Sequence, residues 1–217
     1  MKVKLIDKMG SDLSVVNAAR VSFAKKSNWD DEIPFSEGNV LKDTDARLIK
    51  YLAKHNHWSP FAHASLQLHI KAPIFVARQL VKHQVGLVWN EISRRYVDSE
   101  PEFYVPKVWR KRPPDSIKQG SDESDTITYG IDGTMMFVTQ TYQNLLNEGV
   151  APEMARMVLP QNLYTEWYWS GTLYAFSRVC NLRCAEDTQS ETRTIADGIQ
   201  NICAKEFPIS WKELFNA

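Results

Sequence analysis

The sequence predicts one globular domain that mixes α-helices with β-strands. In residues 65–72 (SLQLHIKA) apolar side chains alternate with polar ones, which is the period of a half-buried strand. Near the C-terminus, Ile195, Ile199 and Ile202 recur at helical spacing and mark the buried stripe of a long helix. A chain of 217 residues is long enough for one well-buried core, so we expect a single domain over residues 1–217.

Composition and charge narrow the class of protein. An apolar content of 43% with 24% charged residues is ordinary for a soluble globular protein. The 26 basic residues balance the 26 acidic ones, which argues against a general nucleic-acid binder with a broad positive field. The apolar runs are far shorter than the roughly 20 residues of a membrane helix, and MKVKLIDKM lacks the apolar core of a signal peptide. We therefore expect a cytoplasmic protein without nucleic-acid or membrane partners.

The first half of the chain is expected to begin with a strand followed by a helix. The strand lies near 3–6 (VKLI), and the helix lies within 11–23 (SDLSVVNAARVSF), where a capping serine precedes an apolar face. Residues 24–42 have no period and carry proline and glycine, which indicates a surface loop. A second helix should follow from about Thr44. After the alternating strand described above, Pro73 stands where another helix would begin.

The second half is expected to contain polar loops and three helices. Residues 101–106 (PEFYVP) indicate a short extended piece, and 110–128 (RKRPPDSIKQGSDESDTIT) indicate a polar loop whose charges form a solvated face. The three helices are an amphipathic one from Met135 to Gly149, a shorter one from Pro152 to Pro160 that holds Arg156, and a long one that TQSE at 188–191 opens as a capping box.

Residues 78–96 (RQLVKHQVGLVWNEISRRY) concentrate basic side chains in an otherwise neutral protein. Guanidinium groups bind phosphate bidentately, and serine or backbone donors can complete the shell. SRRY at 93–96 is therefore a candidate phosphate site. The alternative is that Arg94 and Arg95 pair with the acids of the following VDSEPE segment at the surface, where an ion pair contributes little.

The histidines raise a different alternative. All five lie between residues 55 and 83, and His55, His57 and His63 could suggest the metal site of a metal-dependent hydrolase. The pattern lacks a carboxylate or cysteine partner at ligand spacing, so we predict no metal. No glycine-rich phosphate loop occurs either, so a flavin or nicotinamide would have to bind outside a Rossmann fingerprint.

Several blocks of the chain, in the same order, are similar to those of the flavin-dependent thymidylate synthases. The blocks are MGSDLSVVNAARVSF, LAKHNHWSPFAH, KAPIFVARQ, NEISRRY, EFYVP, ARMVLPQNLYT and CNLR, which together span nearly the whole chain. The signature of that family is Arg-His-Arg, then seven residues, then Ser. Its counterpart here is Lys82-His83-Gln84, then eight residues, then Ser93. Lysine can still donate to a phosphate, whereas glutamine keeps a hydrogen bond without the charge.

The resemblance implies a fold, an assembly and a reaction. The fold is α+β, with a small, mostly antiparallel sheet and long helices, in a homotetramer whose sites draw on more than one subunit. The reaction is the reductive methylation of dUMP to dTMP, with the methylene from 5,10-methylenetetrahydrofolate and reducing equivalents from NADPH through FAD. The rival to this reaction is a non-catalytic nucleotide-binding relative that has lost the flavin but still binds dUMP.

The resemblance also assigns roles to residues. Arg183 would lie against the uracil edge as the catalytic residue and favour the ionised ring. His57 would line the pocket where folate or nicotinamide approaches. The positions implied for dUMP binding are Gln79, Glu91, Ile92, Ser93, Arg94, Arg95, Arg156 and Arg183. The positions implied for FAD binding are Ser59, Lys82, His83, Gln84, Glu91, Thr172, Leu173, Tyr174 and Arg178.

Overall fold

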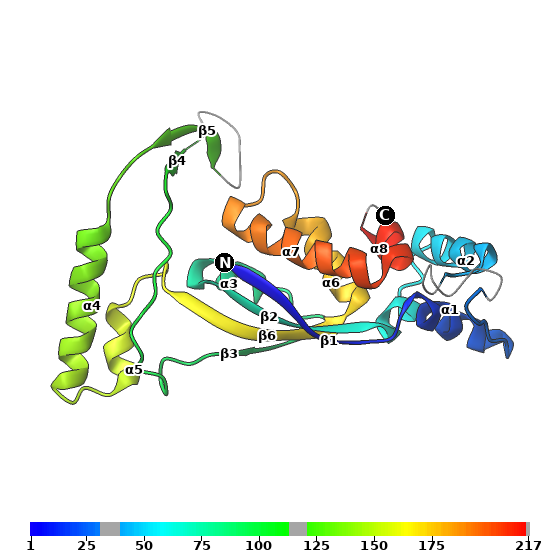
Figure 1. The fold of residues 1–217 in the computed structure, drawn as a ribbon, viewed down its shortest axis with the longest axis horizontal. Coiled ribbons are helices and arrows are strands. Elements are labelled where there is room, and N and C mark those ends of the chain that lie inside the picture. Colours follow the sequence, from blue (N-terminus) through cyan, green and yellow to red (C-terminus); the bar gives the residue numbers. More distant parts are fainter. Residues whose placement is uncertain (31–39, 113–120, 216–217) are drawn as a thin grey trace.

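A four-stranded sheet lies at the centre of the computed structural model of this protein (Figure 1). The structure describes residues 1–30, 40–112 and 121–215. The strands are, in spatial order, β1 (Lys2–Met9), β2 (Ser65–Pro73), β6 (Tyr164–Thr172) and β3 (Leu87–Glu91). Each neighbouring pair is antiparallel, which confirms the expected α+β fold with a small antiparallel sheet.

The two central strands give the sheet its buried face. Leu66, Leu68 and Ile70 of β2 are buried, as the alternating pattern predicts. Trp167 and Trp169 are the corresponding buried residues of β6. The sequence pattern does not predict β6 as a strand, because bulky aromatic side chains occupy both of its faces and hide the alternation.

Six helices of the core pack around this sheet. They are α1 (Asp12–Arg20), α2 (Asp43–Lys54), α3 (Ile74–Leu80), α6 (Leu173–Arg183), α7 (Ser190–Glu206) and α8 (Pro208–Leu214). In Figure 1, α6 and α7 lie above the sheet, and α1, α2 and α8 gather at one end of it. Ile195 and Ile199 of α7 are buried in the core, so the predicted apolar stripe is confirmed.

The part of the chain that we call the arm, residues 104–112 and 121–158, extends away from the sheet (Figure 1). The arm contains a hairpin of β4 (Trp109–Lys111) and β5 (Asp122–Ile127), then α4 (Asp132–Asn147), α5 (Pro152–Ala155) and a 3-10 turn at Arg156–Val158. In Figure 1, α4 and α5 stand beside one end of the sheet, while the hairpin lies near the start of α7. None of the described helices is long and apolar enough to span a membrane.

Most of the expected elements are found. The strand expected at 3–6 is the longer β1, and the helices expected near Thr44 and from Met135 are α2 and α4. The extended piece at 101–106 forms a single β-bridge through Phe103. The predicted loop at 24–42 has no helix or strand in its described parts, and residues 31–39 lie outside the described chain.

Two expectations about the arm need correction. The prediction of a loop over 110–128 is wrong for its described ends, because β4 and β5 pair there, with Trp109 opposite Ile127; residues 113–120 lie outside the described chain. The helix expected over 152–160 is shorter, since it continues as a 3-10 turn only to Val158. Leu159 is already extended, as the residue before a proline favours.

The capping box expected at the start of α7 is also wrong. Gln189 holds the N-cap position, and no side-chain capping bond is formed. The hydroxyl of Thr188 donates instead to the carbonyl of Leu182 over 3.2 Å. The carboxylate of Glu191 accepts from the arm residue Arg110. Tertiary contacts therefore replace the local cap that the four-residue pattern predicts.

Candidate active site

Arg183 and His83 meet although 100 residues separate them in the sequence. Arg183 is the last residue of α6, and His83 lies just beyond the end of α3. Nε of Arg183 donates to Nε2 of His83 over 3.1 Å, which requires an unprotonated Nε2 and hence a neutral imidazole. Burial lowers the pKa of His83, and the charges of Arg183 and Arg178 lower it further. The guanidinium is thus oriented by a group that does not neutralise its charge.

A tight turn connects His83 to β3. The amide of Leu87 donates to the carbonyl of Gln84 over 3.1 Å, and Gly86 within this turn has φ +78°. That backbone conformation favours glycine. Gly171 of β6 lies against the turn, where an added Cβ would stand 2.6 Å from the carbonyl oxygen of Gly86. A glycine is therefore needed at 171 for β3 to pair this closely with β6.

Gln79 is tied to the start of α7 by both ends of its amide. Its Nε2 donates to Oε1 of Gln189, and its Oε1 accepts from the hydroxyl of Thr192 over 3.1 Å. Gln189 in turn donates from Nε2 to Glu191 Oε2 over 3.1 Å. The predicted nucleotide ligand Gln79 therefore has a fixed side-chain orientation.

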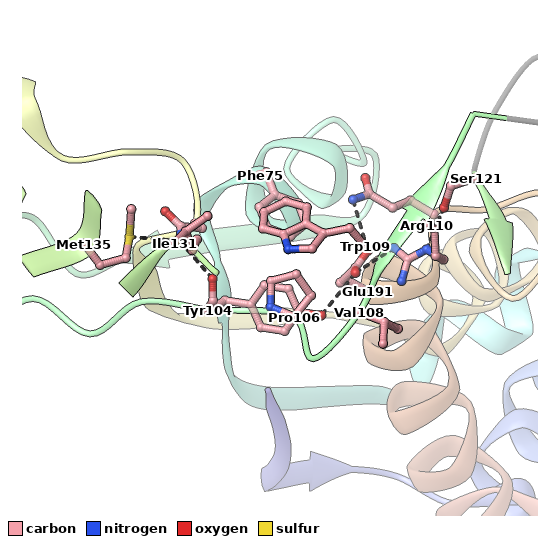
Figure 2. A pocket seen from close by; sticks show the side chains of 12 residues that line it. Phe75, Tyr104, Pro106, Val108, Trp109, Arg110, Ser121, Ile131, Met135 and Glu191 are labelled. Carbon is pink, nitrogen blue, oxygen red and sulfur yellow. Dashed lines mark hydrogen bonds and ion pairs between the residues drawn. The ribbon is translucent and has the colours of Figure 1, made fainter. Parts of the chain in front are cut away.

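Glu191 stands at the wall of a cavity of about 380 Å³ between the arm, α3 and α7 (Figure 2). Nη2 of Arg110 lies 2.7 Å from both carboxylate oxygens, and the hydroxyl of Tyr104 donates to Oε1 over 3.1 Å. Figure 2 shows Trp109 and Phe75 among the apolar side chains that line this cavity. Burial raises the pKa of Glu191, but hydrogen bonds from Arg110 outweigh it, so the pKa falls below its usual value.

A second group of predicted nucleotide ligands lines another cavity, of about 320 Å³, at the far end of β3. These residues are Glu91, Ile92, Arg94 and Arg156. Glu91 is held at the sheet edge, because its Oε1 accepts from the hydroxyl of Thr165 over 2.7 Å. Nε of Arg156 donates to the carbonyl of Glu153 over 3.2 Å. Both arginines thus face one hollow, which is also lined by Lys71 and by the carboxylates of Glu91, Glu100, Glu102 and Glu166.

The arginines of SRRY do not form the surface ion pairs considered as the alternative. Arg94 donates to the backbone carbonyls of Ser99 and Glu100, and no ion pair joins it or Arg95 to a described acid. The guanidinium of Arg95 instead lies over the ring of Tyr96, with 4.9 Å to its centroid. Oγ of Ser93 accepts from the amide of Arg95. The positive charge of this segment therefore remains available for an anion.

A third group brings together predicted flavin and folate positions. His57, Tyr174 and Arg178 line a small cavity of about 80 Å³. Trp58 adds an aromatic wall, with its ring centroid 6.1 Å from that of Tyr174. Ser59 follows directly and is exposed at the start of a 3-10 helix that ends at His63.

The remaining predicted flavin positions have different environments. Lys82 and Gln84 are exposed on the turn that follows α3. Thr172 caps α6, since its Oγ1 accepts from the amide of Ala175 over 3.1 Å. The side chain of Leu173 is fully buried in the hydrophobic core.

The predicted nucleotide ligands are divided between two places in one subunit. Arg94 and Arg156 line the cavity at the far end of β3, whereas Gln79 and Arg183, together with the predicted flavin ligand His83, do not line it. The latter three lie where α3, α6 and the start of α7 meet. A single subunit therefore does not gather all the predicted dUMP ligands around one hollow.

The histidine cluster gives no support to a metal-dependent hydrolase. The rings of His55 and His57 lie 6.3 Å apart, centroid to centroid, on an exposed segment. Across residues 1–30, 40–112 and 121–215, no three histidines, cysteines or acids gather in a way that could hold a metal ion.

Sequence reasoning missed the cluster of Tyr104, Arg110, Gln189 and Glu191. Arg110 fell in a segment interpreted as a solvated loop, and Glu191 was assigned to a helix cap. The sequence places an acid in the first turn of α7 and an arginine beside a tryptophan in WRK, but nothing local pairs the two. Their contact spans 81 residues and depends on how the arm packs.

Comparisons with known proteins agree over nearly the whole chain. The family model described as "Thymidylate synthase complementing protein" matches residues 4–209. A flavin-dependent thymidylate synthase of Thermus thermophilus is 41% identical over 215 residues, covering 96% of this chain and 73% of that protein. A flavin-dependent thymidylate synthase of Kosmotoga olearia is 38% identical over 221 residues, covering 99% and 90%.

Solved structures give the same answer for the fold. The UMP/dUMP methylase PolB of Streptomyces cacaoi, bound with 5-Br dUMP, superposes with a TM-score of 0.76 at 29% identity, covering 99% of this chain and 94% of that one. Its complex with 5-Br UMP gives a TM-score of 0.77 at 27% identity. The family model matches most of the sequence, and relatives 38–41% identical align with nearly all of this chain, so the chain belongs to the family of flavin-dependent thymidylate synthases.

Proposed function

We propose that this protein catalyses the reductive methylation of dUMP to dTMP with FAD, taking the methylene from 5,10-methylenetetrahydrofolate and reducing equivalents from NADPH. The observation that carries the proposal is the pairing of Arg183 with a neutral His83, in a chain whose relatives are flavin-dependent thymidylate synthases. C5 of uracil is a poor nucleophile until negative charge on the ring is stabilised. An arginine whose charge is not offset supplies that stabilisation.

The donor set of the site fits FAD. Lys82, Gln84 and Arg178 are exposed donors, and no ion pair ties Lys82 or Arg178 to a described acid. Two free cations suit a pyrophosphate, and the Trp58 and Tyr174 rings offer apolar faces to a flat ring system. FAD bound there would supply the redox chemistry that connects NADPH to the pyrimidine. Lys82, His83, Gln84 and Arg178 are the residues that would hold it.

The segment after β3 would hold the phosphate of dUMP. Arg94 is anchored by backbone carbonyls, so its position does not depend on the ligand. Arg95 and Arg156 add two more exposed guanidiniums, and Ser93 adds a hydroxyl. Guanidinium groups bind a phosphate dianion bidentately, which gives this region the chemistry for the charged end of the nucleotide.

The assembly we propose is a homotetramer in which one subunit's Arg94 and Arg156 complete a site that contains another subunit's Gln79 and Arg183. The division of the predicted ligands between two places in one subunit supports composite sites. Exposed apolar residues on the arm support subunit contacts there, since Met136 and Phe137 of α4 are 72% and 71% exposed.

The reaction is tested by single-turnover conversion of dUMP with prereduced enzyme and saturating methylenetetrahydrofolate. Arg183→Ala should keep its fold and its flavin but slow dTMP formation on the order of a hundredfold or more, because about 3 kcal/mol of charge stabilisation is lost. Arg47→Ala, an exposed arginine on α2, is the matched control and should keep the wild-type rate. Near-normal turnover of Arg183→Ala would show that another group activates the ring.

A second measurement tests for the flavin. Oxidised flavin in the visible spectrum of the purified protein distinguishes the enzyme from a nucleotide-binding relative that has lost FAD.

Composite sites are tested by co-expressing Arg183→Ala and Arg156→Ala subunits with different tags. If each site uses the two arginines from different subunits, up to about a quarter of the sites regain both, whereas sites within one subunit would regain none.

A further inference from the structure

A directional chain of hydrogen bonds links the arm to Gln79. Arg110 and Tyr104 of the arm donate to Glu191, which is 5% exposed. Gln189 donates to Glu191, and Gln79 donates to Gln189. Glu191 and Gln189 therefore connect the arm to Gln79, which is a predicted nucleotide ligand.

The direction of these hydrogen bonds is set by the carboxylate at one end of the series. A carboxylate only accepts hydrogen bonds, so Gln189 must turn its NH2 group toward Glu191 and its oxygen toward Gln79. Gln79 must then direct its own NH2 toward Gln189 and its oxygen toward the hydroxyl of Thr192, which donates to it. Reversing any one amide would place two donors or two acceptors face to face, at the cost of an unsatisfied polar group in a half-buried position.

The charge of Glu191 is secured by the arm. Both of its oxygens accept from Arg110, and the residue as a whole is almost fully buried. A charge-assisted pair is stronger than a neutral hydrogen bond, and here one nitrogen of Arg110 contacts both carboxylate oxygens. The arm thus fixes the carboxylate of Glu191, which determines how the amides of both glutamines are oriented.

We propose that Glu191 is a positioning residue for nucleotide binding, acting through Gln189 to hold Gln79 with a free N–H donor turned toward a pyrimidine nucleotide. After its contacts with Gln189 and Thr192, the amide of Gln79 keeps one N–H for a ligand. An acceptor on the nucleotide, such as a carbonyl or phosphate oxygen, is the chemistry that this donor recognises. The inference rests on the proposed function, because it requires that Gln79 contacts dUMP.

The test is a double-mutant cycle on the FAD-loaded assembly, with the dissociation constant of dUMP as readout. Glu191→Gln keeps the shape of the side chain but allows the neighbouring amides to reverse. It should weaken dUMP about tenfold when Gln79 is present, and less than about twofold in a Gln79→Ala background. Any general loss of stability from an unpaired Arg110 would act in both backgrounds and would cancel in the cycle.

Two further variants keep the test decisive. Glu206→Gln removes another acid of α7, whose Oε2 lies 2.7 Å from Lys8 Nζ, and it should leave dUMP binding unchanged. If Glu191→Gln does not fold, Gln189→Ala removes the middle link and should show the same dependence on Gln79. Equal losses in both backgrounds would overturn the positioning role while leaving the proposed reaction intact. A wild-type protein that neither binds dUMP nor forms dTMP would overturn both.

Discussion

Two helices of nearly equal length, α7 and α4, have opposite relations to the rest of the chain. In α7, with 17 residues, six side chains are buried, and they include the aliphatic stripe of Ile195 and Ile199. In α4, with 16 residues, only Tyr142 is buried, while Met136 and Phe137 are 72% and 71% exposed. Both helices have an apolar face, but within the part of the chain that the structure describes, most of the apolar face of α4 is uncovered and that of α7 is buried.

This difference separates the parts of the chain that bury their own apolar surface from the parts that do not. The sheet and α7 form a closed hydrophobic core, whereas the arm carries apolar side chains with little to cover them. Exposed apolar surface of this kind is characteristic of subunit contacts. The same division separates the predicted ligands: Arg183 and His83 are positioned by core helices, and Arg156 belongs to the arm.

The largest effect is expected from a charge placed on the exposed face of α4. Phe137→Asp should dissociate the proposed homotetramer and abolish dTMP formation, because an unpaired carboxylate is not tolerated in an apolar interface. Light scattering coupled to size exclusion reads the assembly, and circular dichroism checks that the subunit remains folded. Thr134→Asp, exposed in the first turn of the same helix, should have no such effect. A fully active assembly of Phe137→Asp would mean that α4 is not at an interface.

A smaller effect, on the free energy of unfolding alone, is expected from substitutions in the two helices. In the dissociated Phe137→Asp subunit, Ile199→Ala should lower the free energy of unfolding by about 3 kcal/mol, since it leaves a cavity in the core. Met136→Ala in the same subunit should cost less than about 0.5 kcal/mol, because its side chain touches mainly solvent there. Urea unfolding measures both. Similar losses for the two variants would contradict the division into a closed core and an uncovered arm.

The contact between the two regions should depend on acid. The folded-state pKa of Glu191 lies below its usual 4.5, so its contribution to stability is complete above that pH and is lost as the pH falls through the folded-state pKa. The wild-type protein should therefore lose stability in acid more steeply than Glu191→Gln, which has no charge to lose. Thermal unfolding from pH 6 to pH 3 compares the two slopes. Parallel curves would show that the Arg110–Glu191 pair does not contribute to acid sensitivity.

Elements with a clear local period were predictable, whereas elements made by distant contacts were not. The stripe of Ile195 and Ile199 and the alternation of β2 lie in short windows of sequence, and both are found. The cap expected at Thr188 failed because Arg110, from the arm, takes the carboxylate of Glu191. Local patterns do not contain that competing partner.

The candidate site shows the same limit. The basic residues of SRRY and the Lys82-His83-Gln84 segment are visible in one stretch of sequence. The meeting of His83 with Arg183 spans 100 residues, and only the resemblance to a family placed both in one site. The polar chain from Arg110 to Gln79 has no local signature, because each of its links joins residues on different elements or across a turn.

The smallest expected effect concerns His83, which lies just after the core helix α3. Its folded-state pKa lies below the usual 6.5, chiefly through burial and then through the charges of Arg183 and Arg178. As the pH falls below 6.5, the unfolded chain takes up a proton that the folded chain refuses, so the protein loses stability toward acid in this window. His83→Gln keeps an acceptor for Arg183 but does not titrate, and it should flatten the decline of the melting temperature between pH 7 and pH 5. His63→Gln, at the exposed C-terminal end of the 3-10 helix Ser59–His63, retains His83 and should keep the wild-type decline. Because the Arg183 bond needs a neutral imidazole, protonation should also slow dTMP formation in the wild type more than in His83→Gln. A variant with the same pH dependence as the wild type in both measurements would show that His83 does not hold Arg183 in the way the geometry indicates.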